Sequence, residues 1–324
     1  MINKSEIITD RVSIPYHNYS DRNSPSQVNY YSHMLIEDVC RYLFPVDGCI
    51  NHSPVFKLSS DNDSISELIQ FGFDDHLYHR EYDNSEHSLS SCLSKFGNQT
   101  AYRLLLSGRE MFEVARNLDD LDRVVAFSVL NLDYLRVFLG FTWQTIPKNT
   151  LAEVAHRESS QPFKRRRVRI PHDRIVRIRL PREYRRIPIG LQSLRRVENS
   201  VYSYDSEELW GAEQRAVASV TQSVGWNCRW LHDDMITQYY MMHRFLQFEE
   251  FKAKLRQAVV DGINQILEIA GAHVKFKAKL SVHHLPTLTE IAVSREDLID
   301  GQIEFNQMMD QYSIYRRGRS TSHE

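Results

Sequence analysis

The sequence has little of the material from which phosphate-cradling loops and disulfide frameworks are built. Only 12 of its 324 residues are glycine, and its four cysteines form no C-x-x-C pair. The nucleotide-binding motifs G-x-x-x-x-G-K-S/T and G-x-G-x-x-G are absent, and so is the hydrolase motif G-x-S-x-G. We therefore expect no cofactor. We expect reduced, mostly buried thiols at Cys40, Cys49, Cys92 and Cys228.

Long apolar runs are missing as well. No stretch approaches the roughly 18 apolar residues that are needed to span a bilayer, and the N-terminal MINKSEIITD lacks the charge and apolar pattern of a secretory signal. We therefore expect a protein without a membrane partner, which stays inside a cell or inside a particle assembled there. Hydrophobic residues still make up 42% of the chain, which is enough for one large or two moderate domains.

Positive charge is concentrated in one segment, although the net charge is only −2. Residues 157–196 hold 14 Lys and Arg against three acidic residues, so this segment carries +11 and the rest of the chain −13. A charge run is commonly just a solvated surface. Here, however, arginine outnumbers lysine ten to one between Lys164 and Arg186, and the planar guanidinium binds phosphate with two donors. The pattern predicts contact with the DNA backbone without base specificity, and acidic protein surfaces remain the alternative partner.

The basic segment also alternates in the way that strands do. Arginine and apolar residues take turns over 167–170 and again over 176–180, which predicts two strands with one arginine face each, joined as a hairpin. Lysine and apolar residues alternate over 274–280, which predicts a strand with a second, lysine face. The predicted nucleic-acid contacts are Lys164, Arg165, Arg166, Arg167, Arg169, Arg174, Arg177, Arg179, Arg182, Arg185, Arg186, Lys275, Lys277 and Lys279.

The remaining patterns favour an α+β fold in which a strand-rich part precedes long helices. We expect three regions: a polar part with short helices, a strand-rich α+β domain with the basic strands, and a long-helix region with the lysine-faced strand and a basic tail. Their ranges are 1–100, 101–200 and 201–324. Apolar runs predict buried strands at 104–106, 111–115, 124–130 and 134–141.

Helices are predicted by apolar residues at three-or-four spacing. One covers about 207–224, and a longer one runs from about 229 to Gly271, a rod that exceeds the needs of an ordinary domain. Ser64 and Glu67 form a capping-box pattern ahead of a short helix. Ser294 and Asp297 suggest a cap before a final helical pair.

Four segments, taken in order, resemble phage portal proteins, the ring-forming subunits through which a capsid is filled with DNA. They are LLLSGREMFEVAR at 104–116, IPHDRIVRIRL at 170–180, GLQSL at 190–194, and the C-terminal part from LPT at 285–287 to LIDGQI at 298–303. The third segment has serine where that family usually has proline. The resemblance covers roughly residues 100–305, and the chain is short for the family.

The resemblance implies a non-enzymatic homo-oligomeric ring with long helices lining a DNA channel. It also implies a packaging ATPase and capsid proteins as partners, and a location in the virion or the host cytoplasm. The main alternative is a monomeric or dimeric nucleic-acid-binding regulatory or defence protein, in which the long helix serves dimerisation. Mass in solution separates these two possibilities.

Two further chemistries are weaker in the sequence. A metal-dependent nuclease could use the E-x-K triplet Glu250 to Lys252 with Asp233 and Asp234, but such residues sit on adjoining strands in those nucleases, whereas these fall within a predicted helix. We interpret the triplet as exposed charge pairing. The histidines and carboxylates at 74–87 match no compact ligand set, so we expect no metal site there. Asp61, Asp63 and Glu67 lack the central glycine of a calcium loop.

Overall fold

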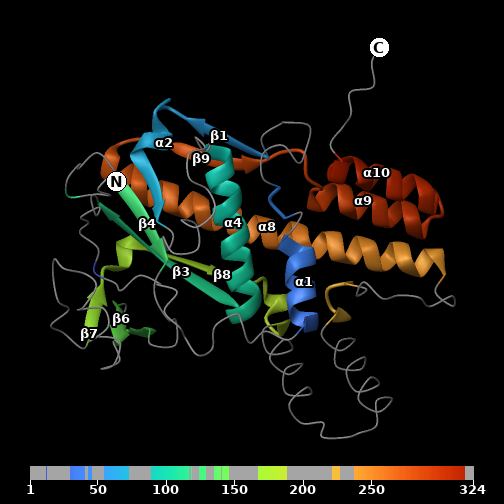
Figure 1. Ribbon diagram of the computed structural model, residues 1–324, viewed down its shortest axis with the longest axis horizontal. Helices are drawn as coiled ribbons and strands as arrows, with labels where there is room; N and C mark the ends of the chain where they lie inside the picture. Colours follow the sequence, from blue (N-terminus) through green and yellow to red (C-terminus); the bar gives the residue numbers. More distant parts are fainter. Residues whose placement is uncertain are drawn as a thin grey trace, which may run out of the picture.

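Figure 1 shows a computed structural model of the chain, in which one long helix crosses the molecule and the other elements pack around it. The combination of helices with largely antiparallel strands confirms the predicted α+β class. The structure describes residues 12, 30–40, 43–45, 55–72, 89–116, 118, 124–128, 135–139, 141–145, 167–187, 221–226 and 237–317.

The long helix α8 spans Gln238–Val274, which is about 55 Å at 1.5 Å per residue. It begins where the side chain of Thr237 accepts a hydrogen bond from the backbone N–H of Tyr240. It ends at Lys275, whose left-handed backbone (φ 62°) lets its N–H bond to the carbonyl of Gly271. Both ends therefore lie further along the chain than the sequence patterns predicted.

Two cores within the chain bury the apolar side of α8. Phe251, Leu255 and Ile263 join the main core, together with α4 (Leu89–Ser107) and the strands. Toward its N-terminus, α8 packs against α9 (Leu288–Ile299) and α10 (Phe305–Arg317), which lie beside it in Figure 1. The length that seemed to exceed the needs of a domain is therefore used for packing inside this one chain.

A mixed four-stranded sheet lies against α8 and α4. Its strand order is β2-β4-β3-β8, with β2 parallel to β4 and the other pairs antiparallel. Six consecutive residues in the middle of β3 are buried, so both faces of this strand are covered. The strands are β2 (Ile69–Gly72), β3 (Arg109–Arg116), β4 (Val124–Ser128) and β8 (Ile175–Arg179).

Two smaller antiparallel sheets complete the described strands. One has the order β5-β6-β7 and packs its inner face on Met111 and Ile175 of the larger sheet. The other pairs β1 with β9 on the opposite side of α8 (Figure 1). These strands are β5 (Leu135–Phe138), β6 (Phe141–Thr145), β7 (Arg167–Ile170), β1 (Phe56–Ser60) and β9 (Ala278–Val282).

One core cluster takes side chains from all three of the sequence ranges 1–100, 101–200 and 201–324. Leu35 and Val39 come from α1 (Tyr30–Cys40), while Phe112, Ile178 and other members come from the larger sheet and α8. The remaining elements are short. They are α2 (Ile65–Leu68) and the 3-10 turns η3 (His172–Arg174) and η4 (Arg182–Tyr184).

Four strand predictions differ from the structure. The predicted buried strand over 134–141 is divided between β5 and β6, which pair with each other, and three of the four β5 residues are exposed. Residues 104–106 are helical, because α4 begins at Leu89 and its apolar period runs through the serine-rich segment to Leu104 and Leu105. The two arginine strands β7 and β8 do not form a hairpin, because β7 pairs with β6 and β8 pairs with β3. The predicted Val274–Leu280 strand is shifted to Ala278–Val282, because α8 continues to Val274.

Both predicted caps were also wrong in detail. The Ser64 side chain makes no capping hydrogen bond to α2. The final helical pair is present, but its first helix begins at a capping box of Thr287 and Glu290. Ser294 lies in the middle of α9, where its hydroxyl accepts a hydrogen bond from Tyr312.

Two observations concern the membrane-spanning segments and the cysteines considered in the sequence analysis. Among the described residues, none of the helices is long and apolar enough to cross a membrane. Cys40 and Cys92 are free thiols, and burial raises the pKa of Cys40 to about 12. Cys49 and Cys228 lie outside the described residues, as do residues 207–220 of the predicted helix over 207–224.

Candidate nucleic-acid interface

The predicted arginines follow one another over β7, η3, β8 and η4. Their alternation is confirmed: Ile170, Val176, Ile178 and Leu180 are buried, while the arginines between them point away from the core. Arg174 and Arg177 are half-buried. The exposed members are Arg167, Arg169, Arg179, Arg182, Arg185 and Arg186. Lys164, Arg165 and Arg166 lie outside the described residues.

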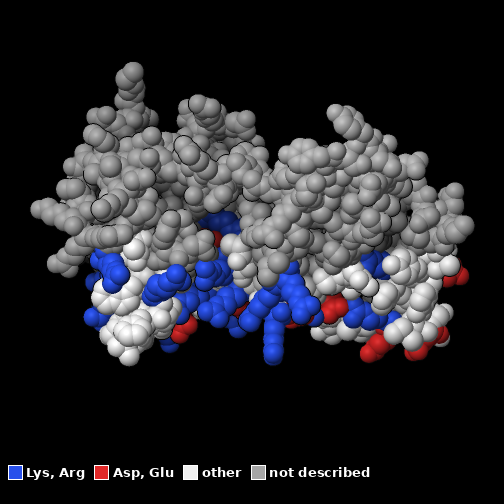
Figure 2. Space-filling model, turned by 90° about the horizontal axis from the view of Figure 1, so that it is seen from below, with Lys and Arg blue, Asp and Glu red and all other residues white. Residues whose placement is uncertain are grey.

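Figure 2 shows Lys and Arg side chains gathered on the face seen from below Figure 1, with few acidic side chains among them. Within the described ranges, no carboxylate forms a salt bridge with Arg179, Arg182, Arg185 or Arg186. Their guanidinium groups are therefore available to an anion. We call these four residues the arginine quartet.

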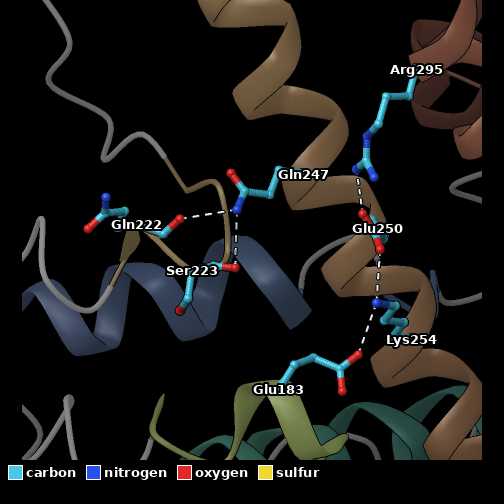
Figure 3. Close-up of polar contacts among 7 residues, drawn as sticks. All are labelled: Glu183, Gln222, Ser223, Gln247, Glu250, Lys254 and Arg295. Atoms are coloured by element: carbon cyan, nitrogen blue, oxygen red, sulfur yellow. Dashed lines mark hydrogen bonds and ion pairs between the residues drawn. The ribbon is translucent and has the colours of Figure 1, made fainter.

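The turn η4 is held on α8 by an aromatic contact and an ion pair. Tyr184 is buried and packs edge-on against Phe251, with ring centroids 4.6 Å apart. Beside it, Oε1 of Glu183 lies 2.9 Å from Nζ of Lys254 (Figure 3). Burial raises the pKa of Tyr184 to about 12, so its hydroxyl stays protonated at neutral pH. These contacts direct the neighbouring arginines of the quartet outward.

Further polar contacts connect the ion pair of Glu183 and Lys254 to α9. Lys254 also contacts Glu250 at 2.8 Å, and Glu250 accepts a hydrogen bond from Arg295 (Figure 3). Burial acts to raise the pKa of Glu250, but the hydrogen bonds from Lys254 and Arg295 outweigh it and lower the pKa. The four-residue chain Glu183–Lys254–Glu250–Arg295 thus joins η4, α8 and α9.

Strand β8 is seated on α8 at a glycine. A Cβ at Gly262 would overlap the Cδ1 and Cγ1 atoms of Ile178, so a larger residue there would have to displace this buried side chain. With Ile178 turned into the helix, Arg177 and Arg179 project from the other side of the strand. The hydroxyl of Thr142 on β6 accepts a hydrogen bond from Arg177, which links the two sheets.

Like charges face each other on this surface. Arg109 on β3 lies directly opposite Arg179 on β8 in an antiparallel pair, an arrangement that destabilises a sheet. Burial lowers the pKa of Arg177, and the charge of Arg179 lowers it further.

The sequence reasoning missed an aromatic component. Trp143 on β6 stands between Arg136 on β5 and Arg169 on β7 in the strand register. The guanidinium carbon of Arg169 lies 3.4 Å from the centroid of the Phe141 ring, a cation–π contact. The alternating pattern F-T-W-Q-T at 141–145 was available in the sequence, but the predicted buried strand ended at Phe141 and no strand was predicted over 142–145.

The predicted lysine face is exposed but separate. Lys275, Lys277 and Lys279 are exposed, while Phe276 and Leu280 of the same segment are buried. Of these three lysines, only Lys279 belongs to β9. Lys275 is the C-cap of α8, and Lys277 precedes the strand. In Figure 1 the β1–β9 ribbon lies on the opposite side of α8 from β6 and β7.

The E-x-K triplet lies within α8, as predicted, but it is not an exposed charge pair. Lys252 is buried and its Nζ lies 2.5 Å from Oε1 of Glu249, while Glu250 turns to Lys254 and Arg295. The two functional groups therefore do not converge on a shared site. Asp233, Asp234 and residues 74–87 lie outside the described residues. Within the described part, no three His, Cys, Asp or Glu side chains are placed to hold a metal ion.

No protein-family model matches the sequence, and no curated protein matches it.

Proposed function

We propose that this chain is a non-enzymatic protein that binds the phosphate backbone of DNA through its exposed arginines between Arg167 and Arg186, which we call the arginine surface. The observation that carries the proposal is the set of exposed guanidinium groups that lack carboxylate partners within the described residues. Guanidinium groups bind phosphate oxygens through two parallel hydrogen bonds.

Backbone binding fits this geometry better than base reading. Arg179 ends strand β8, Arg182 begins the 3-10 turn η4, and Arg185 and Arg186 follow that turn. The neighbouring η3 is also a single short turn. Base-specific recognition of duplex DNA generally inserts a helix or a two-stranded ribbon into the major groove. A row of arginines beside a sheet instead supports contact with phosphates, which fixes position without reading sequence.

The quartet provides the test. We expect substitution of Arg179, Arg182, Arg185 and Arg186 by glutamine to lower duplex DNA affinity roughly 10-fold to 100-fold at low salt. It should also reduce the slope of log K against log salt by about 3 to 4, since each neutralised phosphate contributes about 0.9. Fluorescence anisotropy with a labelled duplex over a salt series measures both quantities.

The lysine face supplies a control with the same change in charge. Replacing Lys57, Lys275, Lys277 and Lys279 by glutamine removes four exposed positive charges from the β1–β9 side. We expect a clearly smaller loss of affinity and slope than with the quartet. Equal losses from the two variants, or no loss from the quartet, would contradict a localised arginine interface.

We propose further that copies of the chain assemble into a ring, as the resemblance to portal proteins implies, in a virion or in the host cytoplasm. The supporting observation is a set of exposed apolar side chains on α9: Leu288, Val293 and Ile299. In Figure 1, α9 and β7 lie toward opposite ends of the molecule, so subunit contacts through α9 would leave Arg167 and Arg169 of β7 free.

Mass in solution tests the ring. We expect light scattering on the full chain to give a large oligomer, and Leu288→Ser together with Ile299→Ser to shift it toward smaller species. A monomer or dimer over the whole concentration range would reject the ring. It would favour the alternative, a nucleic-acid-binding regulatory or defence protein, without affecting the proposed DNA contact.

A further inference from the structure

The outer face of the β5–β6–β7 sheet combines aromatic rings with arginines. Residues that face one another across these strands share a side of the sheet, and successive residues alternate between its sides. The register pairs Phe138 with Phe141, and it pairs Trp143 with Arg136 on one side and Arg169 on the other. Thr142, Gln144 and Ile170 occupy the inner side and are buried.

This outer face is open to solvent. Phe138 is 66% exposed and Phe141 36%, Trp143 is half-exposed, and both Arg136 and Arg169 are exposed. Large aromatic side chains on the solvent face of a sheet are unusual unless they meet a partner. Arginines beside them indicate that the partner is anionic.

We propose that this aromatic face binds single-stranded nucleic acid, with bases stacked on Phe138, Phe141 and Trp143 and phosphates held by the flanking arginines. This goes beyond the proposed duplex contact, because it assigns a second form of nucleic acid to a different group of side chains. Stacking on aromatic rings with an adjoining positive groove is the general mode by which proteins hold single strands.

The spacing of the rings favours a single strand over a duplex. Phe141 and Trp143 are two residues apart on one strand, so their Cα atoms are about 7 Å apart. Bases within a duplex strand are about 3.4 Å apart and cover one another's faces. A chain that stacks one base on each ring must therefore be extended and unpaired.

The arginines suit the same ligand. Arg136 and Arg169 flank Trp143 across the sheet, so a strand that crosses the rings meets positive charge on either side. The guanidinium of Arg169 already lies over the Phe141 ring and can slide toward a phosphate when a base takes that place. Arg167 extends the charge along β7.

The experiment compares two ligands and two variants of the full chain. Phe138→Thr, Phe141→Thr and Trp143→Thr together remove the rings at solvent-facing strand positions, where threonine is well tolerated. We expect affinity for a labelled oligothymidylate to fall at least about 100-fold, since stacking contributes roughly tenfold per ring. Affinity for a hairpin-capped duplex should change less than about twofold.

A matched apolar variant and a second ligand sharpen the outcome. Tyr239→Gln, Tyr240→Gln and Met241→Gln remove exposed apolar side chains from the start of α8 and should leave oligothymidylate binding unchanged. An unchanged affinity in the aromatic variant, or an equal loss for duplex and single strand, overturns the proposal. So does binding to phosphatidylserine vesicles that depends on the rings when oligothymidylate binding does not, because the face would then bind a lipid surface.

The two proposals fail separately. The aromatic variant keeps the arginine quartet, and the quartet variant keeps all three rings. If the quartet variant retains duplex affinity while the aromatic variant loses single-strand affinity, only the duplex proposal falls. The reverse pattern removes the single-strand site and leaves the duplex contact standing.

Discussion

Glu249→Leu is expected to destabilise the fold by about 3–5 kcal/mol, because it leaves buried positive charge without its partner. Glu249 and Lys252 are one helical turn apart on α8, both nearly inaccessible to solvent, with Nζ 2.5 Å from Oε1. Arg256 follows on the same helix and is also buried. Burial lowers the pKa of Arg256 to about 10, and the charge of Glu249 acts to raise it. Removal of one carboxylate therefore affects two cations.

The double variant Glu249→Leu with Lys252→Met separates charge from packing. An apolar pair of similar size satisfies the site without an ion pair, so we expect it to recover most of the lost stability. Urea denaturation followed by far-ultraviolet circular dichroism gives the free energy of unfolding for each variant. A single variant within about 1 kcal/mol of the parent would show that the pair is not a buried one. A double variant no better than the single would attribute the loss to packing.

This buried pair shows where sequence reasoning reached its limit. The spacing of apolar residues predicted the long helix, but Lys252 of the E-x-K triplet was interpreted as an exposed charge because nothing local shows that α9 and the segment before it pack on α8. Arg256 donates a hydrogen bond to the carbonyl of Pro286, a residue 30 positions away. Charges that are buried by distant segments leave no periodic signal.

For the two arginine strands β7 and β8, the burial pattern could be predicted from the sequence, but the pairing with other strands could not. Alternation alone predicted which side chains of 176–180 are buried, because a period of two is a local property of the backbone. The pairing of β7 with β6 and of β8 with β3 was not predictable, since partner strands are chosen by tertiary packing. Adjacency in sequence suggested a hairpin, but η3 carries the chain from one sheet to the other.

The helix at 89–107 was not predicted from the sequence, for a different reason. Three consecutive leucines fit a buried strand as well as a helix, and the serines before them suggested a loop. Leu93, Phe96 and Leu104 keep a helical period through that polar stretch. The aromatic face was missed because the predicted buried strand over 134–141 ended at Phe141 and left Trp143 out, although the alternation of both with polar residues indicated a sheet with one open side.

Gly225→Ala is expected to destabilise the chain by about 2–5 kcal/mol, from backbone strain and overlap together. Gly225 has a left-handed backbone (φ 74°), and a Cβ there would overlap the carbonyl oxygen of Arg244. It would also lie 2.7 Å from the backbone nitrogen of Phe248 and from Cβ of Gln247. These atoms belong to α8 and cannot move without opening the helix.

The segment around Gly225 is a joint between elements, so its displacement should be felt widely. The buried guanidinium of Arg244 donates to three backbone carbonyls of 221–226, and Gln247 donates to those of Gln222 and Ser223 (Figure 3). From the same segment, Trp226 donates to Asp38 of α1 at 2.9 Å. The close approach that only glycine allows thus lets one segment bridge α1 and α8.

Gly301→Ala is the matched control. Gly301 has a similar backbone (φ 66°), but its missing side chain faces open space, so alanine there adds backbone strain alone, about 1–2 kcal/mol. The difference between the two variants in the free energy of unfolding isolates the overlap with α8. Equal losses would mean that residues 221–226 can withdraw from the helix freely. A larger loss at Gly225, with near-ultraviolet circular dichroism altered by a displaced Trp226, would confirm that this segment is fixed on α8.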